Sequence, residues 1–98
     1  MHAPHLLDLE VAQTLRRHVR RRGVAPDHAR TALGRLVALQ MTRYPHWEML
    51  DRIWALRENI TAYDAVYVAL CEALDAPLVT LDRRLANASG HRAKVEVF

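Results

Sequence analysis

An apolar residue stands at every fourth position from Leu7 to Val19. Side chains at this spacing share one face of a helix, and a glycine often follows the end of such a helix. Because Gly23 lies just beyond the pattern, we expect a helix over residues 6–21. A Pro-Asp pair followed by leucines at helical spacing predicts a second helix over residues 26–39.

The middle of the chain predicts a short extended stretch and then a third helix. Pro45 disfavours helical backbone in the residue before it, so residues 41–44 are expected to be extended. The third helix is predicted from His46 to about Glu58. Its large apolar side chains are expected on one side of the helix, and they are Trp47, Leu50, Ile53 and Trp54.

The next helix has the most distinctive pattern. Thr61 is a good N-cap residue, and Asp64, three positions later, completes a capping-box pattern with Asp in place of the usual Glu. Residues 62–74 are apolar or small on nearly every helical face. A helix of this kind is buried on most sides, so Asp64 is expected at the start of an interior helix.

The C-terminal part alternates between strand and helix signals. Residues 77–81 are typical of a short buried strand, residues 82–88 of a small helix, and residues 95–97 of a final strand. Strands that alternate with helices favour a parallel sheet covered by helices, which is the α/β class. No repeat or linker divides the chain, so residues 1–98 are predicted to form a single domain.

Composition narrows the class of protein. Half of the residues are apolar, and no apolar run is long enough to cross a bilayer, so we expect a soluble protein without a membrane segment. Cys71 is the single cysteine, which fits the reducing cytoplasm and is best interpreted as a small buried hydrophobe. His2 and His5 are interpreted as flexible surface residues rather than metal ligands.

The net charge of +3 fits an anionic partner without requiring one. Basic side chains crowd into one seven-residue stretch, and they are Arg16, Arg17, His18, Arg20, Arg21 and Arg22. On a helix, four of these arginines share a broad face that could hold nucleic-acid phosphates, and they are Arg16, Arg17, Arg20 and Arg21. The alternative is a solvated helix end whose positive charges favour the helix dipole.

Three carboxylates stand where they could carry chemistry. Glu10 lies between two apolar residues, Asp64 opens the buried helix, and Asp82 follows a buried strand, where parallel sheets place their ligands. Converging carboxylates repel one another unless a cation neutralises them, and Mg²⁺ or Mn²⁺ suits oxygen ligands. Taken singly, each acid also has a structural interpretation, because Asp64 and Asp82 could cap helices and Glu10 could face solvent.

Three segments resemble motifs of the PIN-domain toxins of VapBC-type toxin–antitoxin pairs. Residues 59–70 closely resemble their T-x-Y-D-A-x-Y-x-A-L signature, and residues 78–85 are similar to their L-x-T-x-D-x-x-L segment. Residues 4–11 resemble the proline-to-Glu-Val segment that begins their acid-bearing middle helix, although Gln13 stands where relatives commonly carry Asn or Ser. The three motifs occur in the family's order.

The resemblance implies a PIN-like three-layer fold, with a parallel sheet flanked by helices, and metal-dependent cleavage of RNA. Glu10, Asp64 and Asp82 would be three of the acids that hold Mg²⁺ or Mn²⁺, and Thr80 would be an accompanying hydroxyl. The resemblance also implies a cognate antitoxin as partner and a homodimer, whose interface could use apolar side chains of the third and fourth helices.

The family pattern opens with a strand that carries an acid in a V-x-D-x-S/T segment, and these 98 residues contain no such segment. We therefore expect at most three of the usual four acids, and a sheet incomplete at the N-terminus. Unpaired buried backbone groups cost roughly 1–3 kcal/mol each, so a longer chain, a partner strand, strand exchange or a rearranged sheet must compensate.

The alternative function is a catalytically dead PIN-like module that oligomerises or binds an antitoxin. A small DNA-binding protein has no supporting motif.

Overall fold

A computed structural model describes residues 1–76, 78–80, 90–91 and 94–97. The chain forms two compact units, Met1–Arg43 and Tyr44–Phe98, which are called unit 1 and unit 2 below. Each unit is described by itself.

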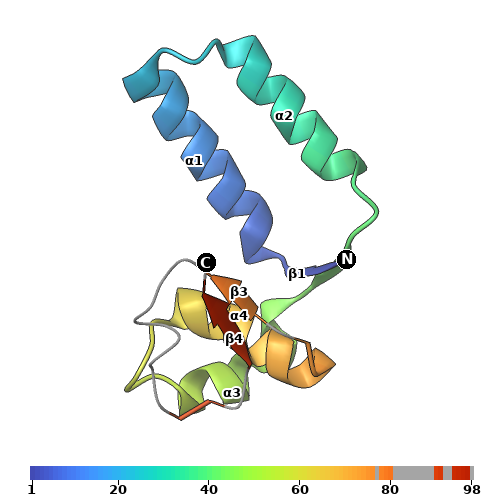
Figure 1. The fold of residues 1–98 in the computed structure, drawn as a ribbon, viewed down its shortest axis with the longest axis vertical. Coiled ribbons are helices and arrows are strands. Elements are labelled where there is room, and N and C mark those ends of the chain that lie inside the picture. Colours follow the sequence, from blue (N-terminus) through green and yellow to red (C-terminus); the bar gives the residue numbers. More distant parts are fainter. Residues whose placement is uncertain (77, 81–89, 92–93, 98) are drawn as a thin grey trace. The chain divides into compact units, whose positions relative to one another are not determined.

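Unit 1 is built around a helical hairpin. Helix α1 (Leu6–Arg22) and helix α2 (Pro26–Ala38) pack side by side, as the blue and green ribbons of Figure 1 show. Gly23 ends α1 in the left-handed conformation (φ 69°), which glycine adopts without steric cost. Pro26 begins α2, where its fixed φ is already helical. The two predicted helices are therefore confirmed to within one residue at each end.

A short pair of strands flanks this hairpin in the sequence. Strand β1 (His2–Pro4) pairs with strand β2 (Thr42–Tyr44), and the Thr42 N–H donates to the Met1 carbonyl at 2.9 Å. The extended stretch predicted before Pro45 is therefore confirmed as β2.

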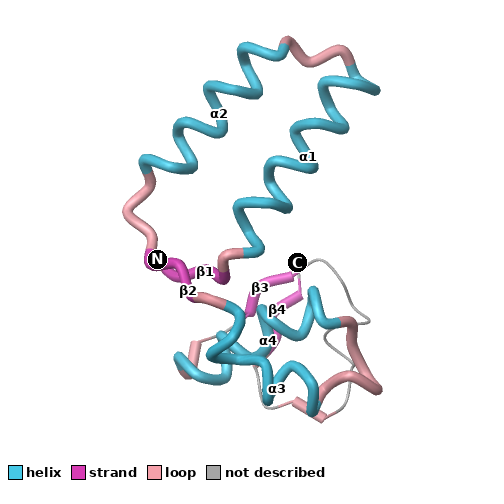
Figure 2. Tube along the Cα trace, turned by 180° about the vertical axis from the view of Figure 1, so that it is seen from behind, coloured by secondary structure: helices cyan, strands magenta, loops and turns pink. Residues whose placement is uncertain are grey.

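Unit 2 contains the 3₁₀ helix η1 (His46–Met49), helix α3 (Leu50–Ala55), helix α4 (Ala62–Leu74) and the strands β3 (Leu78–Thr80) and β4 (Val95–Val97). The two strands lie side by side in Figure 2, and they pair in parallel, with Leu78 opposite Val95 and Thr80 opposite Val97. This pair confirms the predicted parallel α/β class. The small helix predicted over residues 82–88 lies outside the described residues.

The prediction of one continuous helix from His46 to Glu58 is wrong. The segment begins as a 3₁₀ helix, and α3 ends at Ala55. Turns follow, in which the N–H of Asn59 and the N–H of Ile60 both donate to the Leu56 carbonyl, at 3.1 and 3.2 Å. Leu56 is fully buried, so tertiary packing holds a turn where the local pattern favoured helix.

Helix α4 provides most of the core of unit 2. Its buried residues are Ala65, Val66, Val68, Ala69 and Leu70, and they accompany the buried Met49, Ile53 and Leu56. The predicted interior helix is therefore confirmed. Of the apolar residues predicted on one side of the third helix, Ile53 is buried, whereas Trp47 and Trp54 are 71% and 68% exposed. Among the described helices, none combines the length and apolar character needed to cross a bilayer.

Candidate functional site

Asp64 lies in the first turn of α4, as the sequence predicted. The Thr61 hydroxyl accepts a hydrogen bond from the Asp64 backbone N–H at 3.2 Å, which confirms Thr61 as the N-cap. Asp64 is a partly buried residue, and its carboxylate makes no hydrogen bond or ion pair with any described residue. The backbone of Asp64 therefore serves the helix cap, and its carboxylate has no partner among the described residues.

The other predicted acids lie elsewhere. Glu10 is exposed on α1 of unit 1. Thr80 ends β3 in unit 2, and Asp82 lies outside the described residues. The convergence of Glu10, Asp64 and Asp82 on one site stays a prediction.

The predicted basic stretch occupies the C-terminal half of α1. All four arginines assigned to nucleic-acid binding are exposed, and they are Arg16, Arg17, Arg20 and Arg21. Asp27 is the single carboxylate between Glu10 and Glu48, whereas this part of the chain has eight arginines. The excess of positive charge is larger than the dipole of one helix end requires.

Helix α2 adds a second basic feature that sequence reasoning did not single out. A shallow hollow on this helix is lined by His28, Thr31, Ala32 and Arg35. These positions are three, four and seven residues apart and therefore share one helical face. The Arg35 guanidinium makes no hydrogen bond or ion pair with any described residue, so it is available to an anionic ligand. The helical spacing of these residues was the signal that could have revealed this face.

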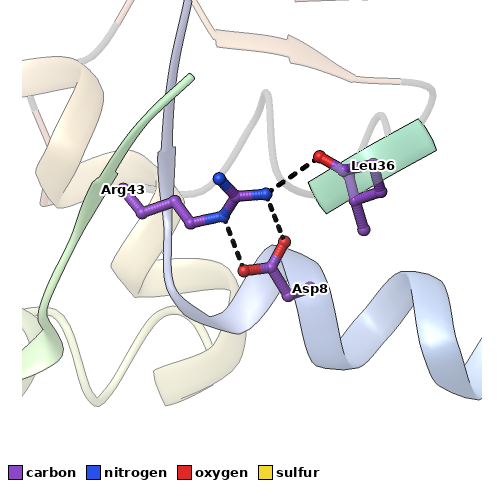
Figure 3. Close-up of polar contacts among 3 residues, drawn as sticks. All are labelled: Asp8, Leu36 and Arg43. Carbon is purple, nitrogen blue, oxygen red and sulfur yellow. Dashed lines mark hydrogen bonds and ion pairs between the residues drawn. The ribbon is translucent and has the colours of Figure 1, made fainter. Parts of the chain in front are cut away.

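Sequence reasoning also missed the arginine that ties the helices of unit 1 together. The Arg43 guanidinium donates through Nε to Asp8 Oδ2 at 2.7 Å, and through Nη2 to Asp8 Oδ1 at 3.1 Å (Figure 3). The same Nη2 donates to the Leu36 carbonyl at 3.1 Å, also drawn in Figure 3. Arg43 thereby joins the first turn of α1 to the last turn of α2.

An arginine of unit 2 makes the same kind of contact. Arg52 of α3 donates through Nε and Nη2 to the two carboxylate oxygens of Glu72 on α4, at 2.7 and 2.9 Å. Its Nη2 also donates to the Gly90 carbonyl at 2.9 Å. The Glu72 side chain is 3% exposed, and its hydrogen bonds raise the pKa of the Arg52 guanidinium. The contact therefore stabilises the charged form of Arg52.

A cluster of apolar side chains of unit 2 faces solvent. Trp47, Leu50 and Trp54 lie at helical spacing on η1 and α3, and all three are more than half exposed. The Arg57 guanidinium lies 4.6 Å from the centre of the Trp54 ring, a cation–π contact. A contiguous exposed apolar surface of this kind is typical of a contact with another protein.

The two histidines near the N-terminus are exposed, whereas the single cysteine is partly buried. His2 and His5 are exposed, which confirms their place at the surface. Cys71 is partly buried on α4, and this burial raises the pKa of its thiol. The interpretation of Cys71 as a packing residue agrees with a thiol that is disfavoured as a thiolate.

Comparison with known proteins agrees with the three PIN-domain motifs found in the sequence. Residues 1–90 match the family model described as PIN domain. The chain is 48% identical over 96 residues to ribonuclease VapC1 of Mycobacterium tuberculosis H37Rv, covering 97% of this chain and 72% of that protein. It is 43% identical over 97 residues to VapC ribonuclease Mb0985 of Mycobacterium bovis, covering 99% of this chain and 76% of the relative. Ribonuclease VapC12 of M. tuberculosis H37Rv is 35% identical over 97 residues, covering 99% and 75%. The chain therefore belongs to the PIN-domain family, among its VapC-type members.

Proposed function

We propose that this protein is a divalent-metal-dependent endoribonuclease and the toxin of a toxin–antitoxin pair. The observation that carries the proposal is the identity of 35–48% with ribonucleases of the VapC type over nearly the whole chain. Asp64 supports it independently, because this residue is partly buried and its carboxylate has no hydrogen-bond or ion-pair partner among the described residues. We further propose that units 1 and 2 together make up one PIN domain over residues 1–98, because the family match spans both units.

In this proposal Glu10, Asp64 and Asp82 hold Mg²⁺ or Mn²⁺, and the Thr80 hydroxyl supports them. Oxygen donors suit these hard cations, and the Asp64 carboxylate fits because no arginine or lysine of the described residues neutralises it. A bound ion supplies Lewis-acid and water-activating chemistry for attack on a phosphodiester. The Thr61 cap fixes the backbone at Asp64 and so limits the positions that this carboxylate can take.

The RNA backbone is held by unit 1. Arg16, Arg17, Arg20 and Arg21 are exposed on α1 and contact phosphates without reading bases. The hollow on α2 supports this assignment, because Arg35 adds a further cation to the same unit. Such contacts are electrostatic, so RNA affinity should fall steeply as salt rises.

The proposed partners follow from the family and from one exposed surface. A cognate antitoxin silences the toxin, and both act in the cytoplasm. A homodimer uses apolar side chains of η1, α3 and α4, of which Trp47, Trp54 and Tyr63 are exposed. Light scattering of wild type beside Trp54→Glu tests the dimer, because a charge at this surface should shift the molecular mass towards the monomer.

A second candidate function is a catalytically dead PIN-like module that binds an antitoxin or itself. The observation that favours it is the exposure of Trp47, Leu50 and Trp54 on η1 and α3, which gives unit 2 apolar side chains for a protein contact. Under this alternative the exposed aromatic surface carries the function, and the carboxylates are not needed.

One experiment decides between the two functions. Cleavage of a panel of structured RNAs is measured with Mg²⁺ or Mn²⁺, with EDTA, and with the variants Asp64→Asn and Asp51→Asn. Asp51 is exposed on α3 and is not one of the proposed ligands, so Asp51→Asn makes the same change of charge as Asp64→Asn and serves as its control. Metal-dependent cleavage that Asp64→Asn abolishes and Asp51→Asn retains supports the ribonuclease. A folded wild type that cleaves no RNA and is indistinguishable from Asp64→Asn supports the binding module.

A further inference from the structure

Three groups of unit 2 form a charged contact far from the Asp64 carboxylate in sequence. Arg52 of α3, Glu72 of α4 and Gly90 are joined by the hydrogen bonds of 2.7, 2.9 and 2.9 Å described above, and we call this contact the Arg52 clamp. Arg52 is the central member, because its guanidinium reaches both the Glu72 carboxylate and the Gly90 carbonyl. Lysine could not replace it, since an ammonium lacks the planar fork that matches two carboxylate oxygens.

Gly90 lies beside the turn between α3 and α4, which contains Leu56 and Asn59. Its φ is +92°, a backbone conformation that L side chains rarely adopt. A Cβ added there would lie 2.7 Å from Asn59 Nδ2 and 3.8 Å from Leu56 Cδ2. The backbone at Gly90 therefore lies against the turn, and any other residue there would have a strained φ and would displace the Asn59 side-chain amide.

The same turn leads directly into the candidate metal ligand. The N–H of Asn59 donates to the Leu56 carbonyl at 3.1 Å, and two residues later Thr61 caps α4. The Thr61 hydroxyl accepts from the Asp64 N–H at 3.2 Å, and the Thr61 carbonyl accepts from the Ala65 N–H at 2.8 Å. A displacement of the turn would therefore move the backbone from which the Asp64 carboxylate projects.

Stability alone does not account for a charged pair of this kind. Removing the Glu72 carboxylate, which is 3% exposed, from water carries a desolvation cost that offsets much of its attraction to Arg52. Apolar residues of similar volume often serve stability equally well or better. What they cannot do is donate to a backbone carbonyl such as that of Gly90, so the specific contribution of the pair is positional.

We propose that the Arg52 clamp holds the α3–α4 turn in place and thereby positions the Asp64 carboxylate to bind a divalent cation. This inference rests on the proposed function, since it needs Asp64 to be a metal ligand. Arg52, Glu72 and Gly90 are positioning residues, which act through the turn and do not contact the metal or the RNA.

The main test measures Mn²⁺ affinity by calorimetry, together with the midpoint of thermal unfolding, on the full chain. The variants are the double replacement Arg52→Met with Glu72→Met, the single replacement Arg52→Lys, and Gly90→Ala. Asp51→Asn is the charge control, and Gly23→Ala is the backbone control. Gly23 also has positive φ (+69°), but a Cβ added there would meet no atom within 4 Å, and the residue belongs to unit 1.

We expect the double Met variant to stay folded and to bind Mn²⁺ about tenfold more weakly, the lower end of the loss seen for residues that orient metal ligands. Arg52→Lys and Gly90→Ala should also weaken binding severalfold, whereas Asp51→Asn and Gly23→Ala should stay within twofold of wild type. A folded double variant with wild-type affinity overturns the proposal. If the double variant does not fold, Gly90→Ala decides, and affinity equal to that of Gly23→Ala overturns the proposal.

Failure of the proposed function gives a different result. In that case wild type and Asp64→Asn show the same Mn²⁺ titration and neither cleaves RNA, so the clamp has no ligand to position and the inference fails with the function. If instead wild type binds Mn²⁺ and Asp64→Asn does not, the function stands, and the clamp variants alone decide the inference.

Discussion

Replacing Asp64 by Asn separates the structural role of this position from its chemical role. The hydrogen bond that caps α4 uses the backbone N–H of Asp64, which the variant keeps, and the carboxylate has no described partner to lose. Its charge near the helix N-terminus contributes about 0.3–1 kcal/mol, and relief of repulsion among the proposed acids opposes that loss. We therefore expect the free energy of unfolding to change by less than about 1 kcal/mol.

Thr61→Ala gives the scale for a purely structural loss at the same helix end. Removing the hydroxyl that accepts the Asp64 N–H at 3.2 Å should cost about 1 kcal/mol, or roughly 4–8 °C in the unfolding midpoint of a domain of this size. Asp64→Asn should shift the midpoint by no more than about half of this and should lose Mn²⁺ binding by tenfold or more. The assays are thermal unfolding by circular dichroism and Mn²⁺ titration by calorimetry. A variant Asp64→Asn that unfolds as early as Thr61→Ala while binding Mn²⁺ normally would refute the reasoning.

Three further predictions concern packing, pH and backbone conformation. Leu56 is fully buried, so Leu56→Ala should lower the free energy of unfolding in urea by about 2–5 kcal/mol, and a loss below about 1 kcal/mol would contradict its place in the core. Burial raises the pKa of the Cys71 thiol, so the unfolded chain ionises first and stability should fall as pH rises from about 8 to about 10. Urea midpoints of wild type and Cys71→Ala should therefore diverge in that range, and parallel curves would show that burial of the thiol is unimportant. Gly34 is exposed in α2, and a Cβ added there would meet no atom within 4 Å, so Gly34→Ala should raise stability by up to about 1 kcal/mol. Gly23→Ala should lower it by about 1–2 kcal/mol because of its positive φ, and equal effects of the two alanines would argue against that backbone conformation.

The elements that the sequence predicted best are those with local end signals. Helix α1 ends before a left-handed glycine, α2 begins at a proline, and α4 begins after Thr61, and each signal acts within a few residues of the end it marks. The third helix was predicted too long because its end depends on the burial of Leu56, which is a tertiary effect. Apolar spacing also could not say which side of that helix faces the core, so the exposure of Trp47 was not foreseen.

The sequence motif of the candidate site could be predicted, but the long-range ion pairs of Arg43 and Arg52 could not. Asp64 and its cap were identified because Thr61 and Asp64 are three residues apart, a spacing with a known helical meaning. The contacts of Arg43 with Asp8 and of Arg52 with Glu72 join residues 35 and 20 positions apart. No periodic pattern relates such positions, and only the folded chain brings them together.

The division of charge between the two units gives the proposed function a physical basis. Unit 1 contains eight arginines and three carboxylates, a net charge of +5, whereas unit 2 contains eight carboxylates and six basic residues, a net charge of −2. Carboxylates that bind a metal also repel phosphates, so a protein that needs both functions gains from additional cations that attract RNA, and of the three proposed metal ligands only Glu10 belongs to the basic unit 1. Arginine variants of α1 should therefore raise KM and flatten its dependence on salt, whereas Asp64→Asn should lower kcat and leave KM nearly unchanged. The opposite pattern, a salt-dependent KM effect from Asp64→Asn and none from the α1 arginines, would place RNA binding in unit 2 and remove the reason for the charge division.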